Sequence, residues 1–104
     1  MNTPKIWGPS RWRIFHNSTK NYPDNPTKAD MARVDNYFNR IFETKIPCGS
    51  CKASYIRFKS ILQVKYYLQS RKQLMFWGFL FHNLVNEKLG KPMFTYDQFV
   101  QLYY

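Results

Sequence analysis

The apolar residues of this 104-residue chain recur at intervals of three and four, which is the spacing expected for α-helices. No segment shows the two-residue alternation of a half-buried strand. A first helix is predicted to open at Pro9 and Ser10 and to end before Tyr22. It places Trp12 and His16, which are four residues apart, on one face.

A second helix is predicted after a short turn at residues 23–26. The hydroxyl of Thr27 is suited to cap it, and it runs up to Ile46 and Pro47. Five apolar residues of this helix have the spacing of a core-facing stripe, namely Met31, Val34, Phe38, Ile41 and Phe42.

The third helix is predicted to begin within the segment Cys48-Gly-Ser-Cys51. Its expected buried side comprises Tyr55, Ile56, Phe58, Ile61 and Leu62. The chain then turns at residues 66–70.

A fourth and longest helix is predicted from Arg71 to Leu89, closed by Gly90 at the cap position and stopped by Pro92. Residues 95–104 are predicted to form a last short helix. The predicted fold is therefore all-α, a four-helix bundle with an additional short C-terminal helix, and residues 1–104 form a single domain.

The chain carries a net charge of +10, which predicts attraction to an anionic partner such as nucleic acid, a membrane surface or a phosphate-bearing cofactor. From Cys48 to Asn86 there is no acidic residue, and this stretch holds six cations that would raise the positive potential around the cysteines. They are Lys52, Arg57, Lys59, Lys65, Arg71 and Lys72.

The ends of the chain and its apolar runs give no indication of a membrane protein. Residues 1–5 are polar and leave no room for the apolar core of a signal peptide. The apolar run at residues 74–85 is too short to span a bilayer. We therefore expect no signal peptide, no transmembrane segment and no membrane partner.

Cys48 and Cys51 are the only cysteines of the chain, and a CxxC pair of this kind indicates a redox pair or half of a metal site more often than an incidental pair. At a helix N-terminus, one sulfur would lie near unpaired N–H groups and the positive end of the helix dipole. Both lower the pKa of a thiol and make disulfide exchange feasible near neutral pH.

The fourth helix carries a polar cluster on an otherwise apolar segment. His82 and Asn86 are one turn apart, and Asn83 is three residues before Asn86. Such groups are either satisfied within the core or bind a buried polar ligand. We favour a ligand, because Lys91 could neutralise a phosphate while Trp12 and His16 pack against a ring system from the first helix.

Four sequence blocks together resemble the Erv/ALR family of FAD-linked sulfhydryl oxidases, in the order and spacing of that family. The first is Trp-Gly-Pro-x-x-Trp-x-x-x-His at residues 7–16, and the second is Tyr-Pro-Asp-x-Pro-Thr at residues 22–27. The third is Pro-Cys-x-x-Cys at residues 47–51, and the fourth is His-Asn-x-Val-Asn-x-x-Leu-Gly-Lys-Pro at residues 82–92. They span nearly the whole chain.

The resemblance implies a helical bundle that holds FAD beside the CxxC, often as a homodimer. Cys48 would exchange with a protein dithiol, and Cys51 would face the flavin, which passes electrons to oxygen and yields hydrogen peroxide. The cofactor-binding residues would be Gly8, Trp12, His16, His82, Asn83, Val85, Asn86, Leu89 and Lys91. The partners would be oxygen and a protein dithiol as substrate, such as that of a thioredoxin-like protein or another disulfide carrier.

The chain also departs from this family. Many members carry an additional shuttle cysteine pair and a structural disulfide, for which two cysteines leave no room. The C-terminal segment holds Phe99, Tyr103 and Tyr104 where members often have a tryptophan. The minimal form resembles versions from large cytoplasmic DNA viruses, which implies action in the host cytoplasm or the virion.

Three alternatives stay open at the level of sequence. One is a zinc site made of Cys48, Cys51, His16 and His82, although the spacing matches no zinc finger and we predict no metal. Another is a basic, aromatic-rich nucleic-acid-binding module, which is disfavoured because no RNP-like or helix-turn-helix motif is present. The third is a structural dimerisation domain without activity.

Overall fold

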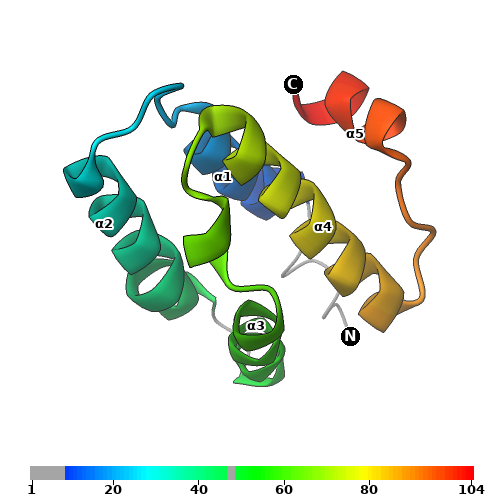
Figure 1. The fold of residues 1–104 in the computed structure, drawn as a ribbon. Coiled ribbons are helices and arrows are strands. Elements are labelled where there is room, and N and C mark those ends of the chain that lie inside the picture. Colours follow the sequence, from blue (N-terminus) through cyan, green and yellow to red (C-terminus); the bar gives the residue numbers. More distant parts are fainter. Residues whose placement is uncertain (1–8, 47–48) are drawn as a thin grey trace.

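The computed structural model describes residues 9–46 and 49–104 of the chain. Its α-helices are α1 (Pro9–Lys20), α2 (Lys28–Asn36), α3 (Gly49–Ile61), α4 (Arg71–Leu89) and α5 (Tyr96–Tyr103). Figure 1 shows α4 in the middle of the molecule, between α2 on one side and α5 on the other. The described residues contain no strand, and the predicted all-α bundle with a short C-terminal helix is confirmed.

The start of α2 follows the prediction. The Thr27 hydroxyl accepts a hydrogen bond from the Asp30 amide at 3.1 Å, and the Asp30 carboxylate accepts one from the Thr27 amide at 2.9 Å. This reciprocal capping box satisfies two backbone donors that the first turn of a helix leaves unpaired.

The end of the second predicted helix differs, because α2 gives way to a π-helical turn, η2 (Tyr37–Ile41), and a 3-10 turn, η3 (Phe42–Lys45). Phe38 and Phe42 are buried as predicted, but Ile41 is 41% exposed and its predicted place in the core is wrong. A π turn holds more residues than an α turn. Phe38 and Phe42, which are four residues apart, therefore stay on one face, while Ile41, three residues after Phe38, is rotated away from it.

The buried face of α3 is narrower than predicted. Tyr55 is buried, and Phe58 and Leu62 are half-buried against the core, at the i, i+3 and i+7 positions of one face. Ile56 and Ile61 lie off this face and are exposed, so their predicted burial is wrong.

The C-terminal end of α4 has the predicted cap, and its start has a cap that was not predicted. Ser70 accepts a hydrogen bond from the Gln73 amide at the start of the helix. Gly90 ends it in the left-handed conformation with φ of 72°, which a residue with a Cβ adopts only at a cost. After the turn, Thr95 and Gln98 form a second capping box that starts α5.

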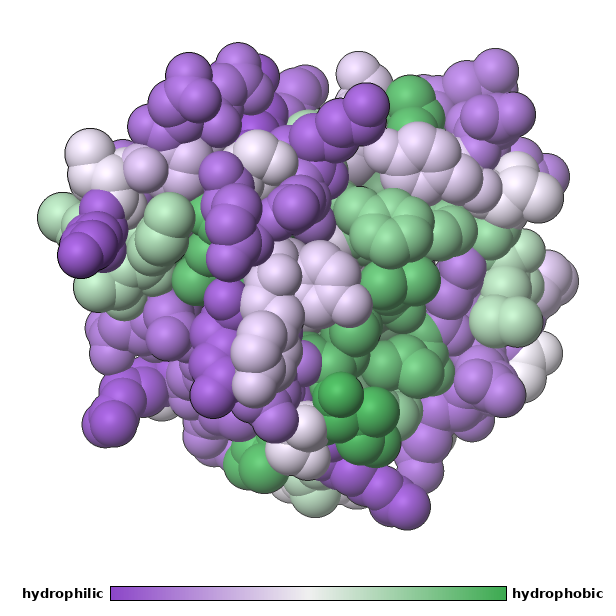
Figure 2. Space-filling view, viewed as in Figure 1, coloured by the Kyte–Doolittle hydropathy of each residue, from purple (hydrophilic) through white to green (hydrophobic). Residues whose placement is uncertain are grey.

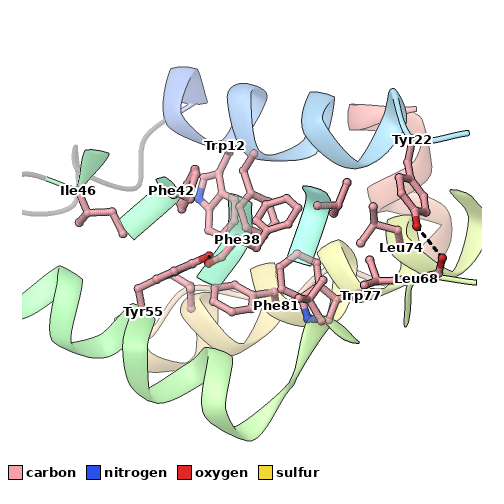
Figure 3. Packing of buried hydrophobic residues seen from close by; sticks show 14 residues of the cluster. Trp12, Tyr22, Phe38, Phe42, Ile46, Tyr55, Leu68, Leu74, Trp77 and Phe81 are labelled. Atoms are coloured by element: carbon pink, nitrogen blue, oxygen red, sulfur yellow. Dashed lines mark hydrogen bonds between the residues drawn. The ribbon is translucent and has the colours of Figure 1, made fainter. Parts of the chain in front are cut away.

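Aromatic rings fill the core between α1, α3 and α4. Phe15 is fully buried, and its ring lies 5.3–5.4 Å from those of Phe38, Phe42, Trp77 and Phe81. Figure 3 shows the labelled rings of Phe38 and Phe81 between α1 and α3.

Core residues with a polar atom find backbone partners. The Trp77 indole N–H donates to the Leu62 carbonyl at 3.0 Å. The Tyr22 hydroxyl donates to the Leu68 carbonyl at 2.7 Å (Figure 3). These bonds tie the segment that leads from α3 to α4 to Trp77 of α4 and to Tyr22, which follows α1.

Within the part of the chain that the structure describes, no helix combines the length and the apolar character needed to cross a bilayer.

Candidate active site

The first turn of α3 carries one of the two cysteines. The helix starts at Gly49, so Cys51 lies in its first turn, as predicted. Its side chain is half-buried and packs against the hydrophobic core. Cys48, like Gly8, lies outside the described residues, and the predicted roles of both stay predictions. Cys51 is thus held near the positive end of the helix dipole.

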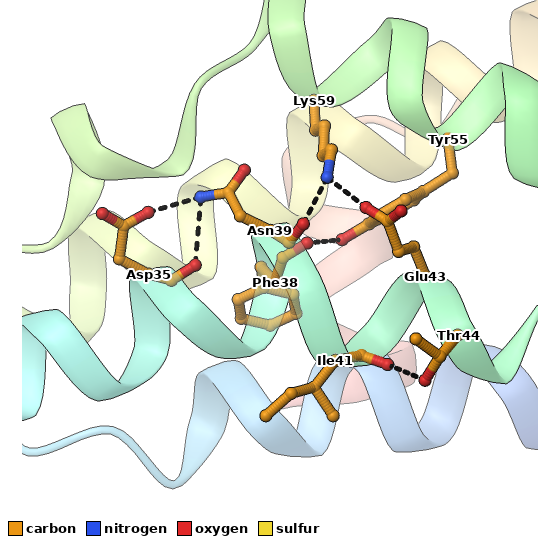
Figure 4. A network of polar contacts seen from close by, with 8 residues as sticks. All are labelled: Asp35, Phe38, Asn39, Ile41, Glu43, Thr44, Tyr55 and Lys59. Carbon is orange, nitrogen blue, oxygen red and sulfur yellow. Dashed lines mark hydrogen bonds and ion pairs between the residues drawn. The ribbon is translucent and has the colours of Figure 1, made fainter.

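A polar network attaches α3 to the segment before it. The Lys59 ammonium of α3 forms an ion pair with Glu43 and donates a hydrogen bond to the Asn39 carbonyl (Figure 4). One turn earlier, the buried Tyr55 hydroxyl donates to the Phe38 carbonyl at 2.6 Å. The π turn thus presents two consecutive carbonyls to α3, and these contacts fix the position of the helix that carries Cys51.

A cavity of about 450 Å³ opens beside Cys51, between α3 and α4. Phe58 of α3 and Val85 and Leu89 of α4 give it apolar walls, while Arg57 and Lys88 contribute positive charge. Two of the residues predicted to bind the cofactor, Val85 and Leu89, therefore lie next to the cysteine helix.

Part of this lining was not predicted from the sequence. Ser54 and Phe58 line the cavity together with Cys51, and the three positions share one helical face at i, i+3 and i+7. This spacing is visible in the sequence and could have indicated that Ser54 and Phe58 lie on the same face as Cys51. The contributions of Arg57 and Lys88 depend on how α3 packs on α4, and no local pattern indicates them.

A stack of three rings joins α1 to α4. The Trp12 ring lies over the His82 ring at 3.5 Å between centroids and 11° between planes, and it also stacks on His16 at 5.4 Å. His16 Nε2 and His82 Nδ1 are 2.9 Å apart and share one hydrogen bond. The structure thus brings together Trp12, His16 and His82 as predicted.

Both imidazoles are neutral at physiological pH. Burial, with a smaller effect of the neighbouring His82, lowers the pKa of His16 to about 2. Burial, with a smaller effect of the Lys91 charge, lowers the pKa of His82 to about 3. One imidazole can therefore donate to the other without a charge in the core.

The inner side of His16 is closely packed. Its Nδ1 atom is buried without a hydrogen-bond partner, and a Cβ on Gly78 would lie only 3.3 Å from it. Tyr103 of α5 contacts the ring at 4.3 Å between centroids, and Phe99 contacts it at 4.7 Å. The C-terminal aromatics Phe99 and Tyr103 thus pack on the predicted site.

The two asparagines of α4 differ in their roles. The Asn83 amide donates to the Phe94 carbonyl at 3.0 Å, and its oxygen accepts from the Phe94 amide at 2.9 Å. The Asn86 side chain is buried, and its backbone carbonyl accepts from the amides of Gly90 and Lys91. Asn83 therefore braces the loop after α4, and its role as a direct cofactor ligand stays a prediction, as does that of Asn86.

The basic stretch is less uniform than its sequence suggests. Lys59 is paired with Glu43, and Arg71 lies 3.5 Å from Asp24, so acids from outside the stretch neutralise two of its six cations. Among the described residues, no group of three or more His, Cys, Asp or Glu is arranged to hold a metal ion. The zinc alternative also needs Cys48, which lies outside them.

The site has features that suit FAD. A planar ring with an attached diphosphate needs apolar walls, neighbouring aromatic rings and positive charge. The cavity beside Cys51 has such walls with Arg57 and Lys88. His82 of the Trp12–His82 stack is on the same face of α4 as the cavity residues Val85 and Leu89, at the i, i+3 and i+7 positions. The residues present therefore fit a flavin dinucleotide.

Comparison with known proteins places the whole described chain in one group. The model of the Erv1/Alr family matches residues 9–104. A probable FAD-linked sulfhydryl oxidase of Acanthamoeba polyphaga mimivirus is 33% identical over 100 residues, covering 95% of this chain and 69% of the relative. A putative FAD-linked sulfhydryl oxidase of Invertebrate iridescent virus 6 is 35% identical over 95 residues, covering 86% and 85%.

Solved structures give the same result. The yeast Erv1 core superposes with a TM-score of 0.85 at 26% identity, covering 99% of this chain and 84% of the other. The FAD-binding domain of Erv1 from Saccharomyces cerevisiae gives a TM-score of 0.84 at 27% identity, covering 99% and 94%.

Proposed function

The chain belongs to the Erv1/Alr family, and on this premise we propose that it is an FAD-dependent sulfhydryl oxidase that forms disulfide bonds in a protein dithiol. The observation that carries this proposal is the position of Cys51, in the first turn of α3 and on the wall of a cavity that α4 closes. This reaction requires a dithiol beside a site that can hold a flavin.

In the proposed reaction the two cysteines have different roles. A substrate thiolate attacks the Cys48–Cys51 disulfide, forms a mixed disulfide with Cys48 and releases the Cys51 thiolate. The second substrate thiolate then attacks the mixed disulfide, which leaves an oxidised substrate and a reduced CxxC pair. When bound, FAD supplies the acceptor for the two electrons of that pair and passes them to oxygen, yielding hydrogen peroxide.

The surroundings of Cys51 support its role as the thiolate that reacts with the cofactor. The N-terminus of α3 and the charges of Arg57 and Lys88 favour a thiolate over a thiol at this position. Trp12, His82 and Lys91 are the residues we assign to the cofactor, through ring contacts and phosphate charge. His16 orients His82 through their shared hydrogen bond.

We further propose that a separate protein delivers the electrons directly to Cys48. The 104 residues contain no second cysteine pair that could act as a shuttle. A thioredoxin-like protein or another disulfide carrier fits this role, because its own dithiol is exposed. The viral relatives support action in the cytoplasm of a host cell or in the virion, and we propose that the active form is a homodimer.

Oxygen consumption with a model dithiol, measured beside the visible absorption of FAD, tests this proposal. Cys51→Ser is expected to abolish turnover and keep FAD bound, and Cys48→Ser to block exchange with the substrate. Ser60→Ala, on the exposed far end of α3, is the matched control and is expected to keep full activity. Ordinary dithiol oxidation by Cys51→Ser would contradict the mechanism.

A further inference from the structure

Three exposed aromatic side chains gather around one hollow at the N-terminal end of α4. Tyr66 is 66% exposed, Phe76 is 41% exposed and Tyr96 is 37% exposed. Among the large apolar side chains that the described residues expose, these three are the only aromatic ones. All three line a cavity of about 640 Å³, which we call the aromatic hollow. Figure 2 shows a strip of apolar surface over α4, bordered by hydrophilic surface on both sides.

The aromatic hollow is formed by three segments that are distant in the sequence. Tyr66 and Tyr67 come from the 3-10 turn η4 (Val64–Tyr67), Phe76 comes from α4, and Tyr96 comes from the first turn of α5. The rings of Phe76 and Tyr96 meet edge to face at 5.9 Å between centroids, so they do not stack on each other. A flat ring of a ligand can therefore pack against the ring faces that stay exposed.

The aromatic hollow also carries positive charge. Lys72 lies on its wall, is exposed, and forms no ion pair with another described residue. The Lys65 ammonium lies 5.2 Å from the centre of the Tyr66 ring and adds a second positive charge. The described residues that line the hollow include no Asp or Glu. The hollow therefore offers aromatic rings and cations to the same ligand.

The position of Lys72 is unfavourable for its own helix. The N-terminus of a helix carries partial positive charge and favours acidic residues, yet the first turn of α4 contains none. The neighbouring Arg71 is compensated, because it donates to the Tyr22 carbonyl at 2.7 Å and lies 3.5 Å from Asp24. No described residue compensates Lys72 in this way, so an anionic ligand would relieve the repulsion at this helix end.

A single strand of nucleic acid matches both properties of the aromatic hollow. Each of its units supplies a flat base and a negatively charged phosphate, and proteins bind such strands by stacking the bases on aromatic side chains in a basic groove. An acidic peptide has the charge but no flat ring in every unit, and the bases of a duplex are stacked on each other. The net charge of +10 adds attraction to a strand at long range.

We propose that the aromatic hollow is a binding site for single-stranded nucleic acid, in which bases stack on Tyr66 and Tyr96 and Lys72 contacts a phosphate. The volume of about 640 Å³ lies within the range of pockets that hold small ligands, about 300–1,000 Å³. The hollow therefore has room for a base and its phosphate, while the rest of the strand lies on the surface.

The aromatic hollow is separate from the cavity beside Cys51. The two share no lining residue. Phe76 of the hollow and Val85 of the cavity are separated by a helical span of about 14 Å along α4. A strand and a cofactor can therefore be bound at the same time. The inference goes beyond the proposed oxidase and does not depend on its chemistry.

Fluorescence anisotropy of the full chain with added FAD tests the proposal. The probe is a short oligothymidylate with a far-red dye, which the flavin emission does not overlap. The unaltered protein is expected to bind this strand about tenfold more tightly than a duplex of the same length. Tyr66→Leu removes a mostly exposed ring and is expected to weaken binding about tenfold, whereas Tyr66→Phe keeps the ring and the affinity. Strand binding needs no turnover, so a failure of the oxidase chemistry leaves this measurement unaffected.

A pair of charge variants sharpens the test. Lys72→Glu and Lys28→Glu change the net charge equally, and each replaces an exposed lysine in the first turn of a helix, but only Lys72 lines the aromatic hollow. Lys72→Glu is expected to weaken binding about tenfold and to lower the slope of log affinity against log salt by about 0.7, and Lys28→Glu to do much less.

Four results would each overturn the proposal. They are equal binding of strand and duplex, equal affinities of Tyr66→Leu and Tyr66→Phe, equal effects of Lys72→Glu and Lys28→Glu, and displacement of the strand by polyglutamate at the same concentration of charge. The last result would identify an acidic peptide as the ligand instead.

Discussion

Two contacts hold the helices that form the site, and they are built differently. Between α1 and α4, stacked rings and a pair of buried histidines make up the contact. Between α3 and the turns η2 and η3, hydrogen bonds of Tyr55 and Lys59 to backbone carbonyls and the ion pair of Lys59 with Glu43 supplement the apolar packing. The first contact lines the proposed cofactor site, and the second positions α3, the helix that carries Cys51.

This difference indicates separate roles for stability and position. Burying aromatic surface contributes a large, non-directional free energy, whereas a partly buried ion pair contributes little net energy but fixes geometry. We therefore expect changes at the α1–α4 contact to act mainly on the free energy of unfolding. Changes at the α3 contact should act more on the position of Cys51.

The largest effect is expected from Phe15→Ala. Phe15 is fully buried between α1 and α4, and its removal leaves a cavity surrounded by rings that cannot close it. The expected loss is about 4 kcal/mol in the free energy of unfolding, measured by denaturant titration. The exposed neighbour Ile14, changed to alanine, is the matched control and should cost well under 1 kcal/mol. Similar losses for the two variants would contradict the aromatic contact.

The second effect is a fall in stability on acidification. Both histidine pKa values are lowered in the folded protein, from 6.5 to about 2 for His16 and to about 3 for His82. Below pH 6.5 the unfolded chain binds protons that the folded chain does not. The contribution of the pair is therefore complete above that pH and is lost as the pH falls. At pH 5 the expected loss is about 2 kcal/mol for each histidine.

Chemical denaturation between pH 8 and pH 5 measures this loss. His16→Gln removes one of the two titrating groups while keeping a polar side chain at the position, so it should reduce the pH dependence by about half. Equal stability of the unaltered protein at pH 8 and pH 5 would show that the imidazoles are not buried in neutral form.

The smallest effect on stability is expected at the α3 contact. Tyr55→Phe removes the hydroxyl that donates to the Phe38 carbonyl and should cost about 1 kcal/mol. Dithiol turnover per folded molecule is also expected to fall, because the lost bond helps to position α3, which carries Cys51. Tyr66→Phe, which alters a mostly exposed tyrosine, is the control. A turnover unchanged in folded Tyr55→Phe would contradict the positioning role.

The sequence was a good guide to the helix ends that carry a cap, but not to the end of α2, which gives way to a π turn. The caps at Thr27 and Gly90 depend on local chemistry, and both form as predicted. It was harder to predict which apolar residues of a helix face the core. Ile41 is exposed because a π turn changes the register before it, and Ile56 and Ile61 are exposed because α3 uses a narrow face. Apolar side chains are equally compatible with a core and with a surface that meets another chain.

The site could be predicted only in part for a related reason. The spacing of Trp12 and His16 placed them on one face, and the structure adds His82 to their stack. The hydrogen bond between the two histidines joins positions 66 residues apart, which no local pattern can indicate. The bond from Asn83 to Phe94 likewise depends on the path of the loop after α4.

The central claim is that a flavin in this protein is reduced by a dithiol through the CxxC pair. The visible absorption spectrum of the purified protein, recorded before and after anaerobic addition of a dithiol, tests it most directly. The account predicts a flavin spectrum that bleaches with the dithiol and returns in air, and that stays oxidised in Cys51→Ser. A colourless protein that takes up no added FAD would contradict it.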